Sequence, residues 1–177
     1  MNWEWIITLV LLVVAVLLLR RIGAGHGDHS RAARLMKEYR VTTAEKLAAA
    51  PEGELVDAVV SRVLAQAQDN RRGDTVKVLA DLQSGPCAVY CVWVVCKEMA
   101  ADGYAALMAS ESKHMASLAA ESFTAIGAPQ CACAFAALTA AADEETERAF
   151  REAVAAEQPL ARCEEYIRDN PQEFIDE

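Results

Sequence analysis

Residues 84–101 read SGPCAVYCVWVVCKEMAA, and this stretch decides the fold that the sequence predicts. Its Ser-Gly-Pro opening is typical of a helix start, because proline fits the first turn, where the amide hydrogen would be unpaired anyway. The residues that follow are apolar on nearly every side of a helix, which indicates burial on most sides. Ten residues separate Pro86 from the charged Lys97, whereas a membrane span needs about 20 apolar residues. We therefore predict that residues 87–101 form the central core helix of a globular domain.

The sequence on both sides of this helix predicts an all-α domain. The chain is rich in alanine and contains only eight glycines and five prolines, a composition that favours helices. Apolar residues recur at helical spacing, and Asp102-Gly103 and Pro159 mark breaks. Predicted helices lie within residues 30–39, 42–50, 52–68, 74–83, 104–109, 112–126, 129–142, 143–157 and 160–169. In the helix over 112–126 we expect one set of residues to face the core: Met115, Leu118, Ala119, Ser122, Phe123 and Ile126.

An uncharged apolar run of 15 residues, 5–19, lies near the start of the sequence and ends at Arg20 and Arg21. A helix over this run would satisfy its own backbone in lipid, and the flanking tryptophans and arginines suit the headgroup region. One alternative is a cleaved signal peptide, although such peptides carry positive charge before the apolar run. A buried helix of a soluble protein is the other alternative. We predict a single-pass transmembrane anchor over residues 1–21.

The arginine pair also predicts an orientation. Because it follows the apolar run, the positive-inside rule puts the N-terminus outside and the remainder of the chain in the cytoplasm. The expected localisation is the cell membrane, with a cytoplasmic globular domain. Residues 22–41 are predicted to form a linker and a short helix, and residues 42–177 the all-helical domain. That length suffices for one domain with its own core.

Negative charge is concentrated near the end of the sequence. The chain carries a net charge of −9, and residues 143–177 hold 12 acidic and 4 basic side chains, net −8. Residues 28–142 have a net charge of only −2. An acidic surface repels nucleic acid and attracts basic partners, so we expect no direct nucleic-acid binding. The alternative interpretation is a solvated helical surface that keeps the protein soluble.

Cysteine and histidine are the residues that could carry chemistry. The six cysteines are Cys87, Cys91, Cys96, Cys131, Cys133 and Cys163. A cytoplasmic domain would keep them reduced, and a zinc site would need two well-spaced pairs such as C-x-x-C. The linker histidines His26 and His29 offer at most a weak metal site, and a Cys–His nucleophile would need Cys96 or Cys131 near His114 in space. We expect no bound metal, no cofactor and no catalytic residue.

Glu98 is the most informative acidic residue, because it follows an apolar helix and precedes the glycine break. One expectation is that it closes the core helix or caps nearby backbone amides. The other is that it forms a small pocket with Tyr104. No phosphate-binding loop, dinucleotide-binding fingerprint, zinc-protease or nucleophile-elbow motif occurs in the sequence.

The sequence around the break resembles a known family. Residues 98–107 read EMAADGYAAL, residues 125–128 read AIGA, and residues 165–174 read EYIRDNPQEF. They resemble the bacterial DNA-mimic-protein-like family of all-helical domains, which reads E-V-x-N-G-G-F-x-Q-F at the break and A-I-G-A at the end of a later helix. The resemblance covers most of residues 42–177. Three positions depart from the family pattern: Ala101, Asp102 and Ala106.

The resemblance implies an all-helical domain that binds proteins and can form a homodimer. One member of the family uses an acidic surface that imitates the phosphate backbone of DNA and occupies a DNA-binding protein. We therefore expect a membrane-anchored, non-enzymatic interaction domain with a basic or DNA-binding protein partner. The alternatives are a membrane-tethered enzyme or metal-binding protein that uses the cysteines, and a structural subunit of a membrane assembly. The expected interaction surface consists of Glu98, Asp102, Gly103, Tyr104, Glu144, Glu145, Glu147 and Glu152.

Overall fold

The computed structural model describes residues 31–69 and 84–176. All regular secondary structure in these ranges is helical, which confirms the all-α prediction. A helix over residues 31–38 comes first. It is followed by α2 (Ala44–Ala49), α3 (Leu55–Asp69), α5 (Ser84–Ala101), α6 (Gly103–Ala109), α7 (Lys113–Ala125), α8 (Pro129–Ala140), α9 (Glu144–Glu157), α10 (Pro159–Asp169) and the 3₁₀ helix η1 (Pro171–Glu173).

Three sequence predictions concern residues outside the described ranges, wholly or in part. The anchor over 1–21, the start of the linker and short helix over 22–41, and the helix over 74–83 lie wholly or partly outside the described residues. Among the residues that are described, no helix is both long enough and apolar enough to cross a bilayer.

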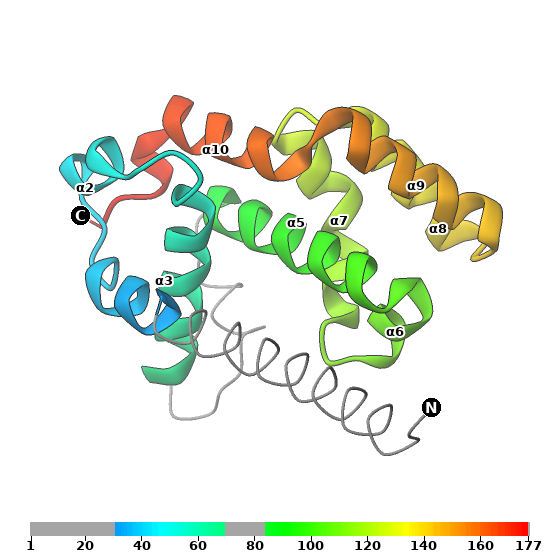
Figure 1. Cartoon of the computed structure of the whole chain (residues 1–177), viewed down its shortest axis with the longest axis horizontal. Coiled ribbons are helices and arrows are strands. Elements are labelled where there is room, and N and C mark those ends of the chain that lie inside the picture. Colours follow the sequence, from blue (N-terminus) through cyan, green and yellow to red (C-terminus); the bar gives the residue numbers. More distant parts are fainter. Residues whose placement is uncertain (1–30, 70–83, 177) are drawn as a thin grey trace, which may run out of the picture.

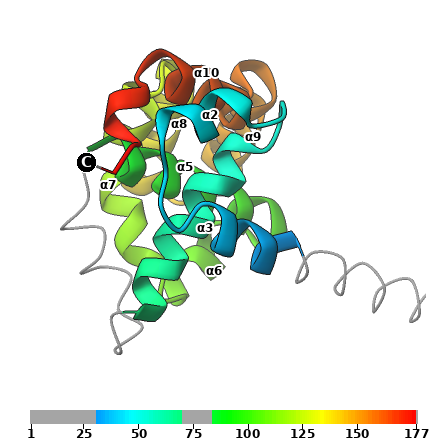
Figure 2. The same ribbon diagram turned by 90° about the vertical axis from the view of Figure 1, so that its left-hand side faces the viewer.

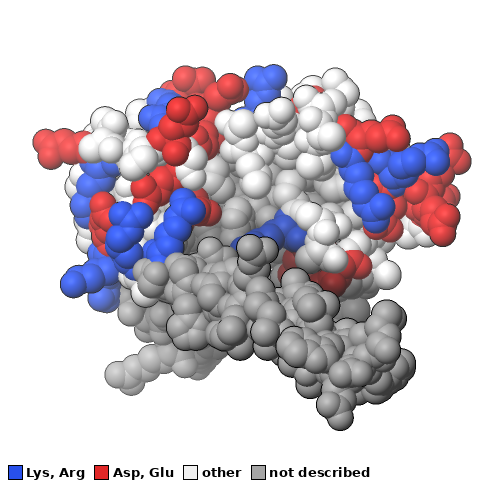
Figure 3. All heavy atoms as spheres, viewed as in Figure 1, with Lys and Arg blue, Asp and Glu red and all other residues white. Residues whose placement is uncertain are grey.

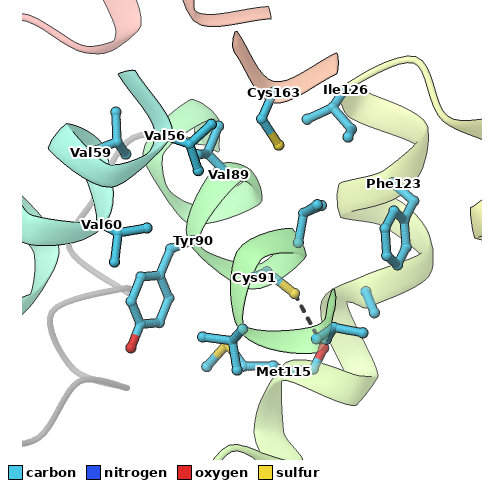
Figure 4. Packing of buried hydrophobic residues seen from close by; sticks show 14 of the residues in the cluster. Val56, Val59, Val60, Val89, Tyr90, Cys91, Met115, Phe123, Ile126 and Cys163 are labelled. Atoms are coloured by element: carbon cyan, nitrogen blue, oxygen red, sulfur yellow. Dashed lines mark hydrogen bonds between the residues drawn. The ribbon is translucent and has the colours of Figure 1, made fainter. Parts of the chain in front are cut away.

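Helix α5 lies at the centre of the fold, as its apolar sequence predicts. Ten of its 18 residues are buried, and it packs against α3, α6, α7 and α10 (Figure 1). Side chains reach α5 from opposite sides, for example Val60 from α3 and Phe123 from α7 (Figure 4). Full burial of such a side chain contributes about 1.5–3 kcal/mol relative to exposure. Helix α5 therefore joins the N-terminal helices to the C-terminal ones through a single core.

A group of aromatic rings holds α7, α8 and α9 together. The ring centroids of Phe123 and Phe135 lie 6.2 Å apart, and Phe150 lies 5.7 Å from the first and 5.2 Å from the second. All three side chains are fully buried. Tilted and edge-on contacts at these distances suit the quadrupoles of the rings. The acidic helix α9 is thus fixed to the core by Phe150.

The breaks between the helices follow the local sequence. Gly103 and Gly127 have φ angles of +79° and +77°, which glycine adopts without the steric cost that a Cβ would bring. At the end of α7 the amide of Ala128 donates to the carbonyl of Phe123 at 2.8 Å, the bond that ends many helices after a glycine. Helix α9 begins with a capping box, in which Asp143 and Thr146 exchange hydrogen bonds between side chain and backbone.

Two segments near the ends of the described chain lie side by side. Helix α2 contacts η1, and both lie on the same side of the molecule as α10 (Figure 2). Gly53, in the turn before α3, donates its amide hydrogen to Glu164 of α10 at 3.0 Å. The phenyl ring of Phe174 is buried, and its centroid lies 6.0 Å from that of Tyr166. These contacts hold the segment after α10 against the domain.

Two details differ from the sequence predictions. Helix α3 begins at Leu55, not at residue 52, because a turn with Gly53 at φ +79° occupies the preceding residues. Leu118 is 38% exposed, so its prediction as a core residue was wrong. The buried stripe of α7 runs through residues spaced three and four apart, such as Met115, Ala119 and Ser122. Leu118 lies to one side of that stripe.

Candidate functional site

A hollow of about 470 Å³ lies beside the last three turns of α5. We call it the Trp93 hollow. Its walls are formed by Tyr90, Trp93, Val94, Lys97, Glu98, Ala101, Asp102 and Ser112. Most of these positions follow one another three or four residues apart along α5, so they form one side of the helix. On this side Lys97, Ala101 and Asp102 are exposed, whereas Tyr90 and Val94 are buried.

An aromatic wall and a cation occupy one part of this hollow. The rings of Tyr90 and Trp93 lie 6.2 Å apart between centroids, with 30° between their planes. The ammonium nitrogen of Lys97 lies 4.5 Å from the centroid of the Trp93 ring. The negative face of an indole ring attracts a cation at this distance. The hollow therefore already holds one positive charge against its aromatic wall.

Two carboxylates occupy the other part of the hollow. Glu98, which is half-buried, accepts a hydrogen bond on Oε1 from the hydroxyl of Ser112 at 2.6 Å. This bond ties the end of α5 to the residue before α7. Glu98 therefore pairs with a side chain, whereas one expectation was that it would cap backbone amides. Asp102 is exposed and stands at the N-cap of α6 without a capping hydrogen bond from its side chain.

Tyr104 lies apart from the Trp93 hollow. Its ring meets that of Phe135 edge-on, with 6.2 Å between the centroids and 74° between the planes. The predicted pocket thus takes a different form: Glu98 and Asp102 line the hollow, while Tyr104 anchors α6 to α8. Of the other lining residues, the polar or aromatic Trp93, Lys97 and Ser112 were missed by sequence reasoning. The spacing along α5 could have indicated the first two, whereas Ser112 comes from another segment.

The predicted acidic residues of α9 fall on two sides of that helix. A Cβ atom at Gly103 would lie 2.7 Å from Oε1 of Glu147, so this carboxylate reaches the break between α5 and α6. Glu144 precedes Glu147 by one turn and is exposed on the same side. Glu145 and Glu152 are also exposed, but Glu152 lines a second hollow between α8 and α9.

Arginines divide the acidic surface of α9. Arg151 pairs with Glu147, and the Nε atom of Arg148 lies 3.7 Å from Oε1 of Glu152. Figure 3 shows red and blue side chains intermingled at the end of the molecule where α9 begins. The surface of α9 therefore mixes five carboxylates with two guanidinium groups, unlike the uniform negative charge of a nucleic-acid backbone.

The second hollow, of about 740 Å³, has an apolar and shallow character. It is lined by Pro129, Gln130, Cys133, Ala134, Ala149, Glu152, Ala153 and Ala156. Most of these side chains are small, and α8 carries no charged residue. Cys133 is exposed at its edge. The side chains that line this hollow offer few polar groups with which to orient a ligand.

Three of the six cysteines, Cys91, Cys131 and Cys163, are buried, and none of the six forms a disulfide within the described residues. Cys91 donates its thiol hydrogen to the carbonyl of Met115 at 3.3 Å (Figure 4). Burial raises the pKa of Cys91 to about 11 and that of Cys96 to about 12. Burial also raises the pKa of Cys163, with a smaller effect from nearby Cys96 and Cys91. Such thiols remain protonated at neutral pH, whereas nucleophiles and metal ligands need the thiolate.

Cys131 is held beside a carboxylate at the start of α8. Glu157, at the end of α9, accepts hydrogen bonds from the amides of Gln130 at 3.1 Å and Cys131 at 2.8 Å. Partial burial opposes the charged form, but these bonds outweigh it and leave the pKa of Glu157 below its ordinary value. Burial, followed by the hydrogen bond and the negative charge of Glu157, raises the pKa of Cys131 to about 12. Glu157 therefore acts as a cap for α8.

The remaining chemical candidates lie on the surface or outside the described residues. His114 is exposed in the first turn of α7, whereas Cys131 is buried. His26 and His29 precede the described part of the chain. Within the described ranges, no three side chains of His, Cys, Asp or Glu are grouped so that they could hold a metal ion. The chain matches no protein-family model, no curated protein and no solved structure.

Proposed function

We propose that the chain is a membrane-anchored, non-enzymatic interaction module that binds a basic protein partner through an acidic face. The observation that carries the proposal is the contact between Glu147 and Gly103, at the break between α5 and α6. It joins two acidic segments that lie more than forty residues apart in the sequence. We define the acidic face by its residues: Glu98, Asp102, Glu144 and Glu147.

The acidic face suits recognition because it is rigid and accessible. Phe150 fixes α9 to the core, and Tyr104 fixes α6 to α8. Asp102 and Glu144 are exposed, so their charges meet solvent or a partner. Acidic side chains on fixed helices attract a basic partner and orient it before contact. DNA mimicry is a narrower form of the proposal. Because arginines pair with two of the acidic residues of α9, the surface suits one basic segment better than it suits a protein that binds the uniform charge of DNA.

The buried thiols support the interaction module over the alternative of cysteine chemistry. The pKa values of Cys91 and Cys96 lie several units above neutrality, so the nucleophilic thiolate is scarce. The acidic face, by contrast, presents the exposed side chains of Asp102 and Glu144. A second copy of the chain remains a candidate partner, in keeping with the homodimer that the family resemblance implies.

The interaction is tested by cross-linking and mass spectrometry on the full-length protein in its native membrane. One variant neutralises the acidic face with Asp102→Asn, Glu144→Gln and Glu147→Gln. The matched control removes the same charge elsewhere with Glu121→Gln, Glu165→Gln and Asp169→Asn, all exposed positions. We expect the first variant to lose a basic partner at 150 mM salt and the control to retain it. Equal capture by both variants would contradict a role for the acidic face.

The anchor is tested separately by fractionation. The apolar run over residues 5–19 predicts that the full-length chain stays in the membrane pellet after alkaline carbonate extraction. Replacing Leu11, Val14 and Leu18 by aspartate should release it, because charge in the hydrocarbon core is costly. Release of the unaltered chain without detergent would refute the anchor and leave the acidic face to be judged by its own test.

A further inference from the structure

The Trp93 hollow combines the two features by which proteins hold a cation. Tyr90 and Trp93 line it with aromatic rings, and Glu98 and Asp102 line it with carboxylates. Aromatic faces attract cations through the ring quadrupole, and carboxylates attract them by charge and hydrogen bonding. With about 470 Å³ the hollow has room for one long side chain.

The structure places a cation in this hollow already. Lys97 lies with its ammonium nitrogen 4.5 Å from the centre of the Trp93 ring. Its side chain is exposed and comes from the rim of the hollow, so it can leave without disturbing the core. The ammonium group therefore shows that the ring accepts a positive charge, and also that an incoming cation must compete with it.

We propose that the Trp93 hollow receives one arginine side chain of the basic partner, which displaces Lys97 from the indole ring. This inference rests on the proposed function and names its point of specific recognition. The acidic face supplies long-range attraction, whereas the hollow supplies a fitted contact for a single residue. Binding replaces one ring–cation contact by another and adds two carboxylate contacts.

Arginine fits the hollow better than lysine does. Its planar guanidinium stacks on an indole ring while its edge donates several hydrogen bonds in fixed directions. Asp102 uses neither oxygen to cap α6, and Glu98 pairs with Ser112 through Oε1. These two carboxylates can thus accept from the guanidinium edge while its face lies on Trp93. An ammonium group offers only a point charge, and Lys97 already supplies one.

Small probes test the hollow without knowledge of the partner. The full-length chain in lipid nanodiscs, labelled with ¹⁵N-tryptophan, is titrated with N-acetyl-arginine methylamide, its lysine analogue and the uncharged citrulline analogue. Trp93→Phe assigns the Trp93 indole signal among the three tryptophans of the chain. We expect a saturable shift of that signal with the arginine probe, a weaker response with lysine and none with citrulline.

A matched pair of lysine variants separates displacement from simple charge. Lys97→Ala removes the competing cation, and Lys113→Ala removes the same charge from an exposed position near Ser112. We expect Lys97→Ala to bind the arginine probe about two- to fivefold more tightly, which corresponds to the loss of one exposed cation–π contact. Lys113→Ala should change the affinity much less at 150 mM salt, where screening weakens distant charges.

A third variant tests the ring itself. Trp93→Leu should weaken binding of the arginine probe at least threefold while thermal unfolding stays cooperative, because Trp93 is only half-buried. Three outcomes would overturn the inference: no shift of the Trp93 signal, equal responses to arginine and citrulline, or equal effects of the two lysine variants. If the arginine probe binds but cross-linking captures no partner in the native membrane, the proposed function alone is refuted. A captured partner that is indifferent to Trp93→Leu would refute the hollow alone.

Discussion

Asp176 and Arg62 form an ion pair that fastens the end of the described chain to α3. The second carboxylate oxygen of Asp176 accepts from the amide of Thr42 at 2.7 Å, and the amide of Asp176 donates to the carbonyl of Thr42 at 2.9 Å. Arg62 also donates to the carbonyl of Phe174 at 2.7 Å. The side chain of Arg62 is 11% exposed and that of Asp176 is 30% exposed, so both charges are partly withdrawn from water.

We predict that Asp176→Ala lowers the free energy of unfolding by about 1–2 kcal/mol, because the buried Thr42 amide loses its carboxylate acceptor and the Arg62 guanidinium loses its ion pair while keeping its bond to the Phe174 carbonyl. Asp169→Asn removes the same charge from an exposed position and should change stability by less than about 0.5 kcal/mol. Urea unfolding of both variants provides the comparison. Equal midpoints for Asp176→Ala and Asp169→Asn would show that the ion pair contributes nothing.

Gly85 is predicted to tolerate no side chain. A Cβ atom there would lie 2.6 Å from Oε2 of Glu173 and 3.0 Å from Cζ of the buried Phe174. The carboxylate end can move, but the ring is fixed in the core. Gly85→Ala should therefore destabilise the protein by about 1–3 kcal/mol through overpacking. Ser84→Ala is the matched control, since it loses only the hydroxyl hydrogen bond to Glu173. If thermal melts show Ser84→Ala to be less stable than Gly85→Ala, the packing argument is contradicted.

Thiol labelling should divide the cysteines by exposure. Cys133 is exposed, whereas Cys91, Cys131 and Cys163 are buried, and burial raises the pKa values of these three thiols. With a maleimide at pH 7 we expect fast modification of Cys133 and protection of the three buried thiols until urea unfolds the domain. Peptide mass spectrometry identifies the sites. Rapid labelling of Cys163 in the folded protein would show that α10 does not cover the core as described.

The cap that Glu157 provides predicts a pH dependence. Its folded-state pKa lies below its ordinary value, so its contribution is fully present above the unfolded pKa of about 4.3 and is lost as the pH falls through the folded value. Stability to urea should therefore decrease on acidification below about pH 4.5. Glu157→Gln should lower stability at pH 7 and flatten this decrease. The exposed Glu121→Gln serves as control, and identical pH profiles for both variants would contradict the role of Glu157.

The helices were predictable because their signals are local. Pro86 and Pro129 mark helix starts, Gly103 and Gly127 occur at positive φ, and Phe150 lies on the buried side of α9. Each of these features depends on neighbours within a turn or two. Leu118 shows the limit, because helical spacing alone leaves residues at the edge of a stripe undecided between the core and solvent.

The candidate site was predictable only in part. The chain position of Glu98 and Asp102 beside the break pointed to them, but the sequence carries no signal that Ser112 bonds to Glu98 or that Glu147 reaches Gly103. Both contacts join different helices and depend on how those helices pack. Tyr104 was expected in the same pocket, yet its ring turns to Phe135 because the aromatic core offers more burial than the rim of α5.

The double pairing of Thr42 with Asp176 closes a loop of 134 residues, whereas α7, α8 and α9 each pack on a close neighbour in sequence. Contacts between distant segments form late, since their closure entropy must be overcome first. During refolding, the central helices should therefore acquire amide protection before residues 42–50 and 171–176. Under native conditions those two segments should exchange their amide hydrogens at matching rates, as one cooperative unit that opens and recloses while the rest of the domain stays intact.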